Sequence, residues 1–160
     1  MPLPEQLGVL EEMRAEGKLD LIGVSNVSLE GVRRALELVQ ISQAQNAYSI
    51  IDRAHEPIVE CWREREIALV PFFPLGSAFS GGPRKLAANP AIAAIAAKHD
   101  ATPSQVALAR LLERYERMLL IPGTMSVAHL EENLAAAKVI LDDEDRDALA
   151  AVVEQGNQMH

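Results

Sequence analysis

Four places in the sequence gather side chains that could hold a ligand, and each lies at the end of a short apolar run. They are Ser25-Asn26, Gln45-Asn46, residues 72–77 and Gly123-Thr124. Their amides, hydroxyls and aromatic rings can form hydrogen bonds with a ligand or stack on it. Few of these groups could serve as an acid, a base or a nucleophile near neutral pH. The residue types therefore indicate a binding site that lacks its own catalytic groups.

Short strands followed by helices must position these side chains. The apolar runs over residues 19–26, 41–48, 67–76 and 118–124 are too short for helices, so we predict strands, the third ending near Pro71. Helices are expected over residues 3–13 with a stop at Gly17, after Ser28, around residues 58–62 and 92–96, after Thr102 and Ser126, and from Asp142. Residues 77–88 are predicted to form a longer mobile loop, since Gly81-Gly82-Pro83 interrupts any regular pattern.

The alternation of strands and helices predicts an α/β fold with parallel strands. Two arrangements fit the pattern, a small doubly wound sheet and part of a (β/α) barrel, and periodicity does not separate them. The sequence contains neither G-x-G-x-x-G nor a phosphate loop ending in Gly-Lys-Ser or Gly-Lys-Thr. In either arrangement the carboxyl ends of the strands gather on one side, where ligands bind.

Composition excludes several classes of protein. The chain has 160 residues, a net charge of −8 and 49% hydrophobic residues, which argues against disorder and against nucleic-acid binding. The single Cys61 cannot form an internal disulfide, and no apolar run is long enough to span a membrane. The first residues lack the features of a secretory signal. We therefore expect one soluble, acidic, cytoplasmic domain over residues 1–160.

Ordinary structural roles account for other conspicuous residues. Ser25-Asn26 could cap the next turn, and Gly81-Gly82 could simply be a flexible loop. Cys61 beside Trp62 indicates packing on a helix face. The four histidines have no metal-ligand spacing, and the acidic residues 142–147 are expected to be a solvated helix start. No metal site is predicted.

Four sequence blocks together resemble the aldo/keto reductase superfamily. They are EGKLDLIGVSN (16–26), QAQNAYSIIDR (43–53), ALVPFFPLGSAF (68–79) and LIPGTMSVAHLEEN (120–133). The resemblance is to the second half of the family's (β/α)8 TIM barrel, about four βα units from strand five to strand eight. Family members reduce carbonyls with NADPH, and their catalytic Asp, Tyr, Lys and His belong to the first four units. The resemblance therefore assigns no catalytic residue to this chain.

The resemblance does assign cofactor-binding positions at the strand ends. Ser25, Asn26 and Gln45 match residues that bind the nicotinamide carboxamide and orient its ring. Phe72 matches an aromatic residue, more often tyrosine, that stacks on the nicotinamide. The segment that lies along the pyrophosphate is matched by Phe73, Leu75, Gly76 and Ser77.

The last block matches the family's site for the adenosine phosphate. Gly123, Thr124 and Ser126 precede a helix whose N-terminus would favour an anion, and Glu132 and Asn133 match adenine contacts. Gly123 and His129 replace a lysine and an arginine that many relatives have. Because neutral histidine lacks the fixed charge of a guanidinium, a preference for NADP over NAD is less strongly indicated.

These positions imply a chain that binds NADP(H) weakly or not at all when alone and is catalytically inactive. Two alternatives remain open: a non-catalytic half-barrel that serves as a binding or scaffold protein, and one subunit of a split reductase. Four strands would leave two open sheet edges, so we expect a partner, either a second copy in a homodimer or a separate N-terminal half. No nucleic acid and no membrane is expected as a partner.

Overall fold

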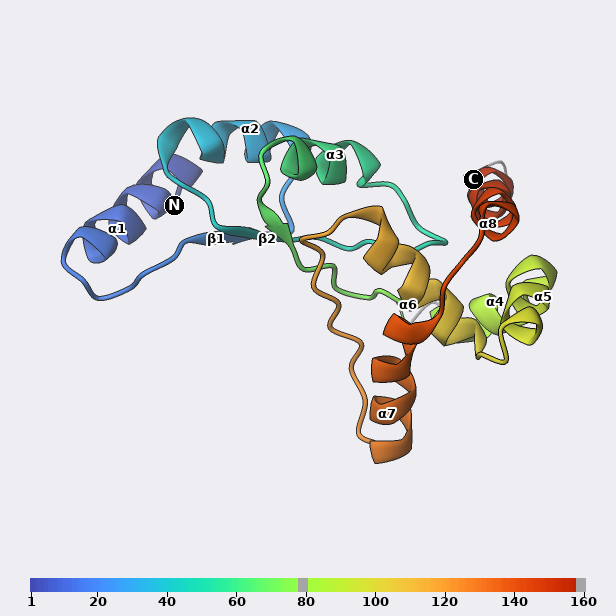
Figure 1. The fold of residues 1–160 in the computed structure, drawn as a ribbon. Coiled ribbons are helices and arrows are strands. Elements are labelled where there is room, and N and C mark those ends of the chain that lie inside the picture. The colour runs from blue at the N-terminus through green and yellow to red at the C-terminus, as the bar shows by residue number, and fades with distance from the viewer. Residues whose placement is uncertain (78–80, 158–160) are drawn as a thin grey trace.

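The computed structural model describes residues 1–77 and 81–157, with side chains described as far as Val152. Strands and helices alternate along the first part of the chain, as predicted (Figure 1). The elements are α1 (Leu3–Ala15), β1 (Gly23–Ser25), α2 (Leu29–Leu38), β2 (Gln43–Gln45), α3 (Glu56–Glu64), β3 (Ala68–Leu69), α4 (Gly82–Ala88), α5 (Pro90–Lys98), α6 (Pro103–Arg114), α7 (Val127–Ala135), the 3-10 helix η2 (Ala136–Lys138) and α8 (Asp143–Asn157).

The three strands form one parallel sheet in the order β1-β2-β3, which confirms the α/β prediction. Gly23 pairs with Gln43 and Ser25 with Gln45, while Gln43 pairs with Ala68 on the other side of β2. None of the helices in the described part of the chain is long and apolar enough to cross a membrane.

The fourth apolar run is not the strand that the sequence predicts. It joins the sheet only through a parallel bridge between Leu69 and Met118, in which the Leu69 amide donates to Arg117 O over 3.0 Å and the Leu119 amide donates to Leu69 O over 2.9 Å. The neighbouring strand β3 is only two residues long, and Pro71 beyond it has no amide hydrogen to donate. The hydrogen-bond ladder between β3 and the run around Met118 is therefore short.

One face of the sheet is covered and the other is not. Val24, Ala44 and Leu69 are buried beneath the helices, and Figure 1 shows α2 and α3 along that side of β1 and β2. Gly23, Ser25 and Gln43 alternate with them and are exposed, while Gln45 is half-buried. We call the side that carries these four residues the open face. The largest fully buried side chains are Trp62, Ile50, Leu69, Leu86, Ile92, Leu108, Leu111, Leu141 and Leu149.

Helices α2 and α6 begin where the sequence predicts because their caps are local. Ser28 Oγ accepts the amide of Gly31 over 3.1 Å, and Thr102 and Gln105 form the complete capping box. Gly17, with a φ of 73°, ends the first helix region as expected.

The predicted loop over residues 77–88 is wrong from Gly82 onward, where helix α4 begins, while residues 78–80 lie outside the part of the chain that the structure describes. Gly82 is buried rather than mobile, because its backbone packs directly on that of Gly76. The Gly82 amide donates to Ser77 O over 2.9 Å, and Pro83 suits the first turn of a helix. A close contact between two glycines leaves no periodic signal in a sequence.

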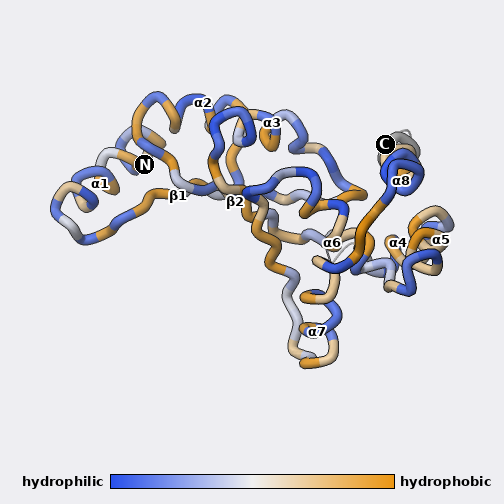
Figure 2. The backbone as a smooth tube through the Cα atoms, in the orientation of Figure 1, coloured by the Kyte–Doolittle hydropathy of each residue, from blue (hydrophilic) through white to orange (hydrophobic). Residues whose placement is uncertain are grey.

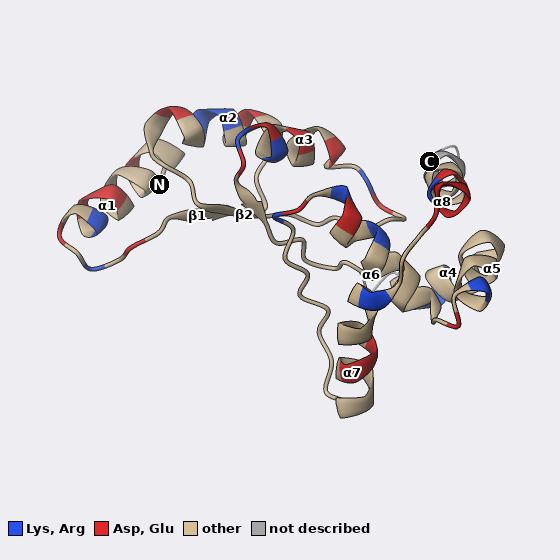
Figure 3. Ribbon diagram, viewed as in Figure 1, with Lys and Arg blue, Asp and Glu red and all other residues tan. Residues whose placement is uncertain are grey.

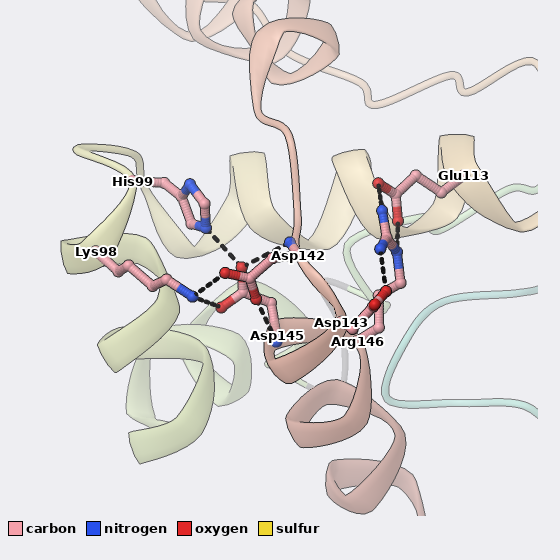
Figure 4. Close-up of polar contacts among 7 residues, drawn as sticks. All are labelled: Lys98, His99, Glu113, Asp142, Asp143, Asp145 and Arg146. Atoms are coloured by element: carbon pink, nitrogen blue, oxygen red, sulfur yellow. Dashed lines mark hydrogen bonds and ion pairs between the residues drawn. The ribbon is translucent and has the colours of Figure 1, made fainter.

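The acidic residues that begin α8 are only partly exposed to solvent. This corrects the expectation that residues 142–147 are a solvated helix start. Asp142 and Asp143 are exposed, but Asp145 is buried at 2% exposure. Its carboxylate accepts from Lys98 Nζ over 2.8 Å and lies 2.6 Å from His99 Nε2, both at the end of α5 (Figure 4). Burial raises the pKa of this carboxyl, but the hydrogen bonds from Lys98 and His99 outweigh burial and hold the pKa well below its usual range.

Substitution of Asp145 should weaken the attachment of α8 to α5. We expect Asp145→Asn to lower the free energy of unfolding at pH 7 by about 2 kcal/mol, since it removes a buried charge that is hydrogen-bonded to Lys98 and His99. A carboxyl with a lowered pKa stabilises the fold above its unfolded value near 4, and this stabilisation is lost as pH falls further. The difference between the two proteins in urea unfolding should therefore shrink below about pH 4. Asp143→Asn, at the exposed carboxylate of the same turn, is the matched control, and equal losses in both variants would contradict the assignment.

Candidate functional site

The carboxyl ends of β1 and β2 bring three of the predicted binding residues together. Ser25 and Gln45 are paired neighbours across the two strands, and the amide of Asn26 donates to Gln45 O over 2.8 Å. Ser25 and Asn26 are exposed and Gln45 is half-buried. Their hydroxyl and amide groups thus lie on adjacent strands with a free side toward solvent.

These residues do not serve as the cap of the following helix. Ser28 performs that role, so the side chains of Ser25 and Asn26 are not needed for it. Asn26 also has a φ of 53°, in the left-handed region that costs an L-residue about 1 kcal/mol, although asparagine tolerates it better than most. Strained backbone of this kind is common where a site is built.

Asn46 fixes the geometry of this corner, a role that the sequence does not reveal. Its side chain is buried at 1% exposure, and its Nδ2 donates to Val27 O over 2.9 Å. The bond ties the end of β2 to the chain that follows Asn26. The side-chain oxygen of Asn46 is buried and has no hydrogen-bond partner among the residues that the structure describes. The only signal for such a residue in the sequence is an amide side chain at the end of a predicted strand.

The segment after β3 continues beside β2 and places two aromatic rings at the same end of the sheet. The Phe72 amide donates to Asn46 O over 3.2 Å, and Phe72 forms a parallel bridge with Ala47. The two phenylalanine rings meet edge to face, with centroids 5.3 Å apart at 80°. Phe72 is half-buried, while Phe73 is 42% exposed and has a φ of 57°. Neither ring belongs to the closed core.

A tight turn follows the aromatic pair. The Gly76 amide donates to Phe73 O over 2.7 Å, and Gly76 has a φ of 79°, which glycine adopts without strain. Leu75, Gly76 and Ser77 are half-buried. The backbone of this turn packs closely against the backbone of Gly82.

The second group of predicted residues surrounds the N-terminus of α7. Thr124 Oγ1 accepts the Ser126 amide over 3.1 Å, and Ser126 Oγ accepts the His129 amide over 3.4 Å. A hollow of about 530 Å³ lies here, lined by Ile121, Pro122, Gly123, Thr124, Met125, Ser126, Val127 and Leu130. Gly123 has open space where a Cβ would point, so a ligand can approach its backbone.

Of the remaining three residues of this group, Glu132 contacts α6 and its cap. Glu132 Oε1 accepts from Thr102 Oγ1 over 2.6 Å, and Glu132 O accepts from Gln105 Nε2 over 3.0 Å. Asn133 is half-buried, whereas His129 is exposed. Figure 1 places the start of α7 at the far end of the extended segment after Met118, well away from β1 and β2.

The first group of predicted residues, at the carboxyl ends of the strands, contains no side chain that could donate or accept a proton near neutral pH. The nearest candidate in sequence, Tyr48, is buried, and its hydroxyl donates to Glu56 over 2.6 Å. Burial, together with the Glu56 carboxylate, raises the pKa of Tyr48 to about 12. Among the residues that the structure describes, no group of three His, Cys, Asp or Glu could hold a metal ion. The arrangement suits binding and orientation of a ligand.

Comparisons with known proteins agree on one family. A profile of the aldo/keto reductase family matches residues 1–154. The chain is 45% identical over 138 residues to pyridoxine 4-dehydrogenase of Escherichia coli, a match that covers 86% of this chain and 46% of that protein. It is 35% identical to probable aldo-keto reductase 1 of Glycine max, covering 95% of this chain and 51% of the relative. The chain thus spans about half the length of the curated relatives it matches.

Solved structures share the fold. The thermostable aldo-keto reductase Tm1743 has a TM-score of 0.82 and 30% identity, with 95% of this chain and 55% of that chain covered. A mutant of Gox0644, solved in complex with NADPH, has a TM-score of 0.78 and 25% identity over 94% of this chain and 55% of its own.

Proposed function

This chain belongs to the aldo/keto reductase family, and from that membership we propose that it is the dinucleotide-binding half of a reductase. In this proposal its strands are the fifth to eighth of a (β/α)8 barrel, with the run at Met118 as the eighth. The complete protein would reduce an aldehyde or ketone with NADPH. An acidic chain with a single cysteine suits the reducing cytoplasm, where we expect it to act.

One observation carries the proposal: Ser25 and Gln45 are adjacent at the carboxyl ends of β1 and β2, on the open face. With Asn26 they offer both donors and acceptors, which is what a carboxamide needs to be held in one plane. Phe72, one step farther along the sheet, offers an aromatic face for stacking. When bound, NADPH would supply the hydride.

The phosphate end of the dinucleotide fits the start of α7. The N-terminus of this nine-residue helix is the positive end of its dipole, and Thr124 and Ser126 add hydroxyls. Open space at Gly123 and the adjoining hollow leave room for a sugar phosphate. Leu75, Gly76 and Ser77 would follow the pyrophosphate between the two ends.

Titration of the chain with NADP⁺ and with 2′,5′-ADP by calorimetry tests this function. We expect 2′,5′-ADP to retain most of the affinity of NADP⁺, because the α7 end needs only local backbone whereas the nicotinamide end needs the rest of a barrel. Thr124→Ala should weaken 2′,5′-ADP binding about tenfold, the value of one hydrogen bond to a charged group. Gln45→Ala is the matched control and should leave 2′,5′-ADP binding unchanged. Binding of nicotinamide mononucleotide without any binding of millimolar 2′,5′-ADP would overturn the assignment.

A further inference from the structure

A cluster of arginine side chains lies between α3 and α6, apart from the candidate dinucleotide site. Arg114, the last residue of α6, donates from Nε to Glu56 Oε1 over 3.0 Å and also bonds to Glu60, both on α3. Arg110 lies one helical turn before Arg114, and Arg53 lies three residues before Glu56. Figure 3 shows that the charged residues of α6 are confined to its second half. The charges of Arg53 and Arg114 both act on Arg110, so the three guanidinium groups are neighbours.

Arg53 has no hydrogen bond to the carboxylate beside it. Its Nε lies 4.0 Å from Glu56 Oε2, beyond hydrogen-bonding distance. Glu56 Oε2 instead accepts from the Tyr48 hydroxyl over 2.6 Å, and Glu56 Oε1 accepts from Arg114. The Arg53 Nε is buried and has no acceptor among the residues that the structure describes. The N–H at this position is therefore cut off from water and unpaired.

Arg110 is in the same situation. Its Nε is also buried, with no acceptor within the described ranges 1–77 and 81–157. The nearby carboxylate of Glu113 is bound through both of its oxygens by Arg146 of α8, over 3.0 and 3.1 Å. Burial lowers the pKa of Arg110, and the neighbouring charge of Arg53 lowers it further. The two guanidinium groups thus repel each other while each keeps an unsatisfied N–H.

An oxyanion between the two arginines would remove both costs. A guanidinium binds two oxygens of a carboxylate or phosphate side by side, and Nε with one Nη forms one of the edges that do so. A phosphate group suits a pair of arginines better than a carboxylate does, because it carries nearly two charges and its oxygens can face both guanidinium groups. The Arg53 side chain is 20% exposed and Arg110 is half-buried, so a small anion can reach them.

The cluster lies in the middle of this chain's own elements. α3 connects β2 to β3, and α6 lies in the chain between β3 and the segment at Met118. Further strands of a barrel would join beside β1 or beside that segment, and neither position borders the cluster. Figure 2 shows hydrophobic and hydrophilic residues mixed along both helices, as expected where one face of each helix is buried and the other carries the charges. The arginine pair is thus a property of this chain.

We propose that Arg53 and Arg110 form an anion site between α3 and α6 that binds a phosphate group, either free or part of a small phosphorylated molecule. The phosphate oxygens accept from both guanidinium groups, which links the chain before α3 to α6. Glu56 and Arg114 position the two sides of the site. This site is separate from the phosphate position proposed at the start of α7, and it does not depend on the proposed dinucleotide binding.

Urea unfolding in phosphate and in chloride, at equal ionic strength, tests the site through a change of sign. Phosphate should raise the unfolding midpoint of the wild-type chain, because a ligand that binds only the folded state stabilises it. Arg110→Met keeps the length and the apolar stem of the side chain. We expect this variant to be more stable than the wild type in chloride, where repulsion and an unpaired N–H are removed, and less stable than the wild type in saturating phosphate. An arginine that is merely structural would lose stability in both anions.

Calorimetric titration with inorganic phosphate measures the affinity directly. Arg110→Met and Arg53→Lys should each weaken binding at least about tenfold, the second because lysine keeps the charge beside Glu56 but lacks the guanidinium fork. Arg33→Met, at an exposed arginine of α2, is the matched control, and Thr124→Ala tests the α7 position; both should bind phosphate as the wild type does. Tighter binding of glycerol 3-phosphate than of inorganic phosphate would identify an organic phosphate as the ligand, and equal or weaker binding would identify the free ion.

Several results would overturn the proposal. One is an Arg110→Met variant that is less stable than the wild type in chloride, and another is an equal response of that variant and the wild type to phosphate. A loss of phosphate binding in Thr124→Ala but not in Arg53→Lys would place the anion at α7 instead.

Discussion

Assayed alone, the chain should reduce aldehydes and ketones with NADPH at least about a thousandfold more slowly than a full-length relative. A hydride transferred to a carbonyl leaves an oxyanion that needs a proton donor nearby. Ser25, Asn26 and Gln45 cannot provide one, and burial and Glu56 keep the pKa of Tyr48 at about 12. General acid assistance contributes about 10² to 10⁴ in rate, and the loss of substrate positioning adds to this. The decrease in NADPH absorbance at steady state measures the rate.

A chimera distinguishes an incomplete enzyme from a misfolded one. The part of the Escherichia coli pyridoxine 4-dehydrogenase that this chain does not match, joined to this chain, should recover the activity of that full-length enzyme. In that chimera Gln45→Ala should raise the KM for NADP⁺ about tenfold, the value of a lost hydrogen bond of about 1.4 kcal/mol. Turnover by the isolated chain within tenfold of the full-length relative would contradict the expectation. An inactive chimera that binds NADP⁺ would instead favour a non-catalytic half-barrel.

Local features of the fold could be predicted from the sequence because their causes are local. The side chains of Ser28, Thr102 and Ser126 satisfy amides within three residues of themselves, so a short sequence window contains the whole interaction. The alternation of short apolar runs with amphipathic helices likewise indicates a parallel sheet without knowledge of any contact.

Features that depend on distant residues could not be predicted in this way. Asp145 is buried because Lys98 and His99, more than forty positions earlier, meet it at the end of α5. The run at Met118 has the composition of a strand, yet it forms only one bridge because its neighbour β3 has two residues. α4 begins at a glycine that sequence patterns assign to a loop.

The residues of the candidate site likewise differ in how far the sequence could predict them. That Ser25 and Gln45 meet follows from a general property of parallel α/β sheets, whose carboxyl ends lie together. The roles given to Phe72, Thr124 and Asn133 come instead from resemblance to a family and remain proposals. The role of Asn46 could not be predicted, because the sequence shows an amide at a strand end but not its bond to Val27, nineteen residues away.

The turn that carries Gly76 and Ser77 should depend on the absence of a side chain at Gly82. A Cβ at Gly82 would lie 2.4 Å from Gly76 C, 2.6 Å from Gly76 Cα and 2.6 Å from Leu75 O. All three atoms are backbone, so no side chain can rotate out of the way. We expect Gly82→Ala to lower the free energy of unfolding by about 3 kcal/mol, the upper range for overpacking, because α4 and the turn must separate. Urea unfolding followed by circular dichroism measures the loss.

Two other glycines make the test specific to this contact. Gly81 has a φ of 72° but open space around its Cβ position, so Gly81→Ala should cost only backbone strain of about 1 kcal/mol. Gly123 has open space and no positive φ, and Gly123→Ala should leave stability unchanged. Equal losses at Gly81 and Gly82 would show that strain, and not the approach to Gly76, determines the cost. If the contact does hold the turn, Gly82→Ala should also weaken NADP⁺ binding more than 2′,5′-ADP binding, because only NADP⁺ has a pyrophosphate to lie along Gly76 and Ser77.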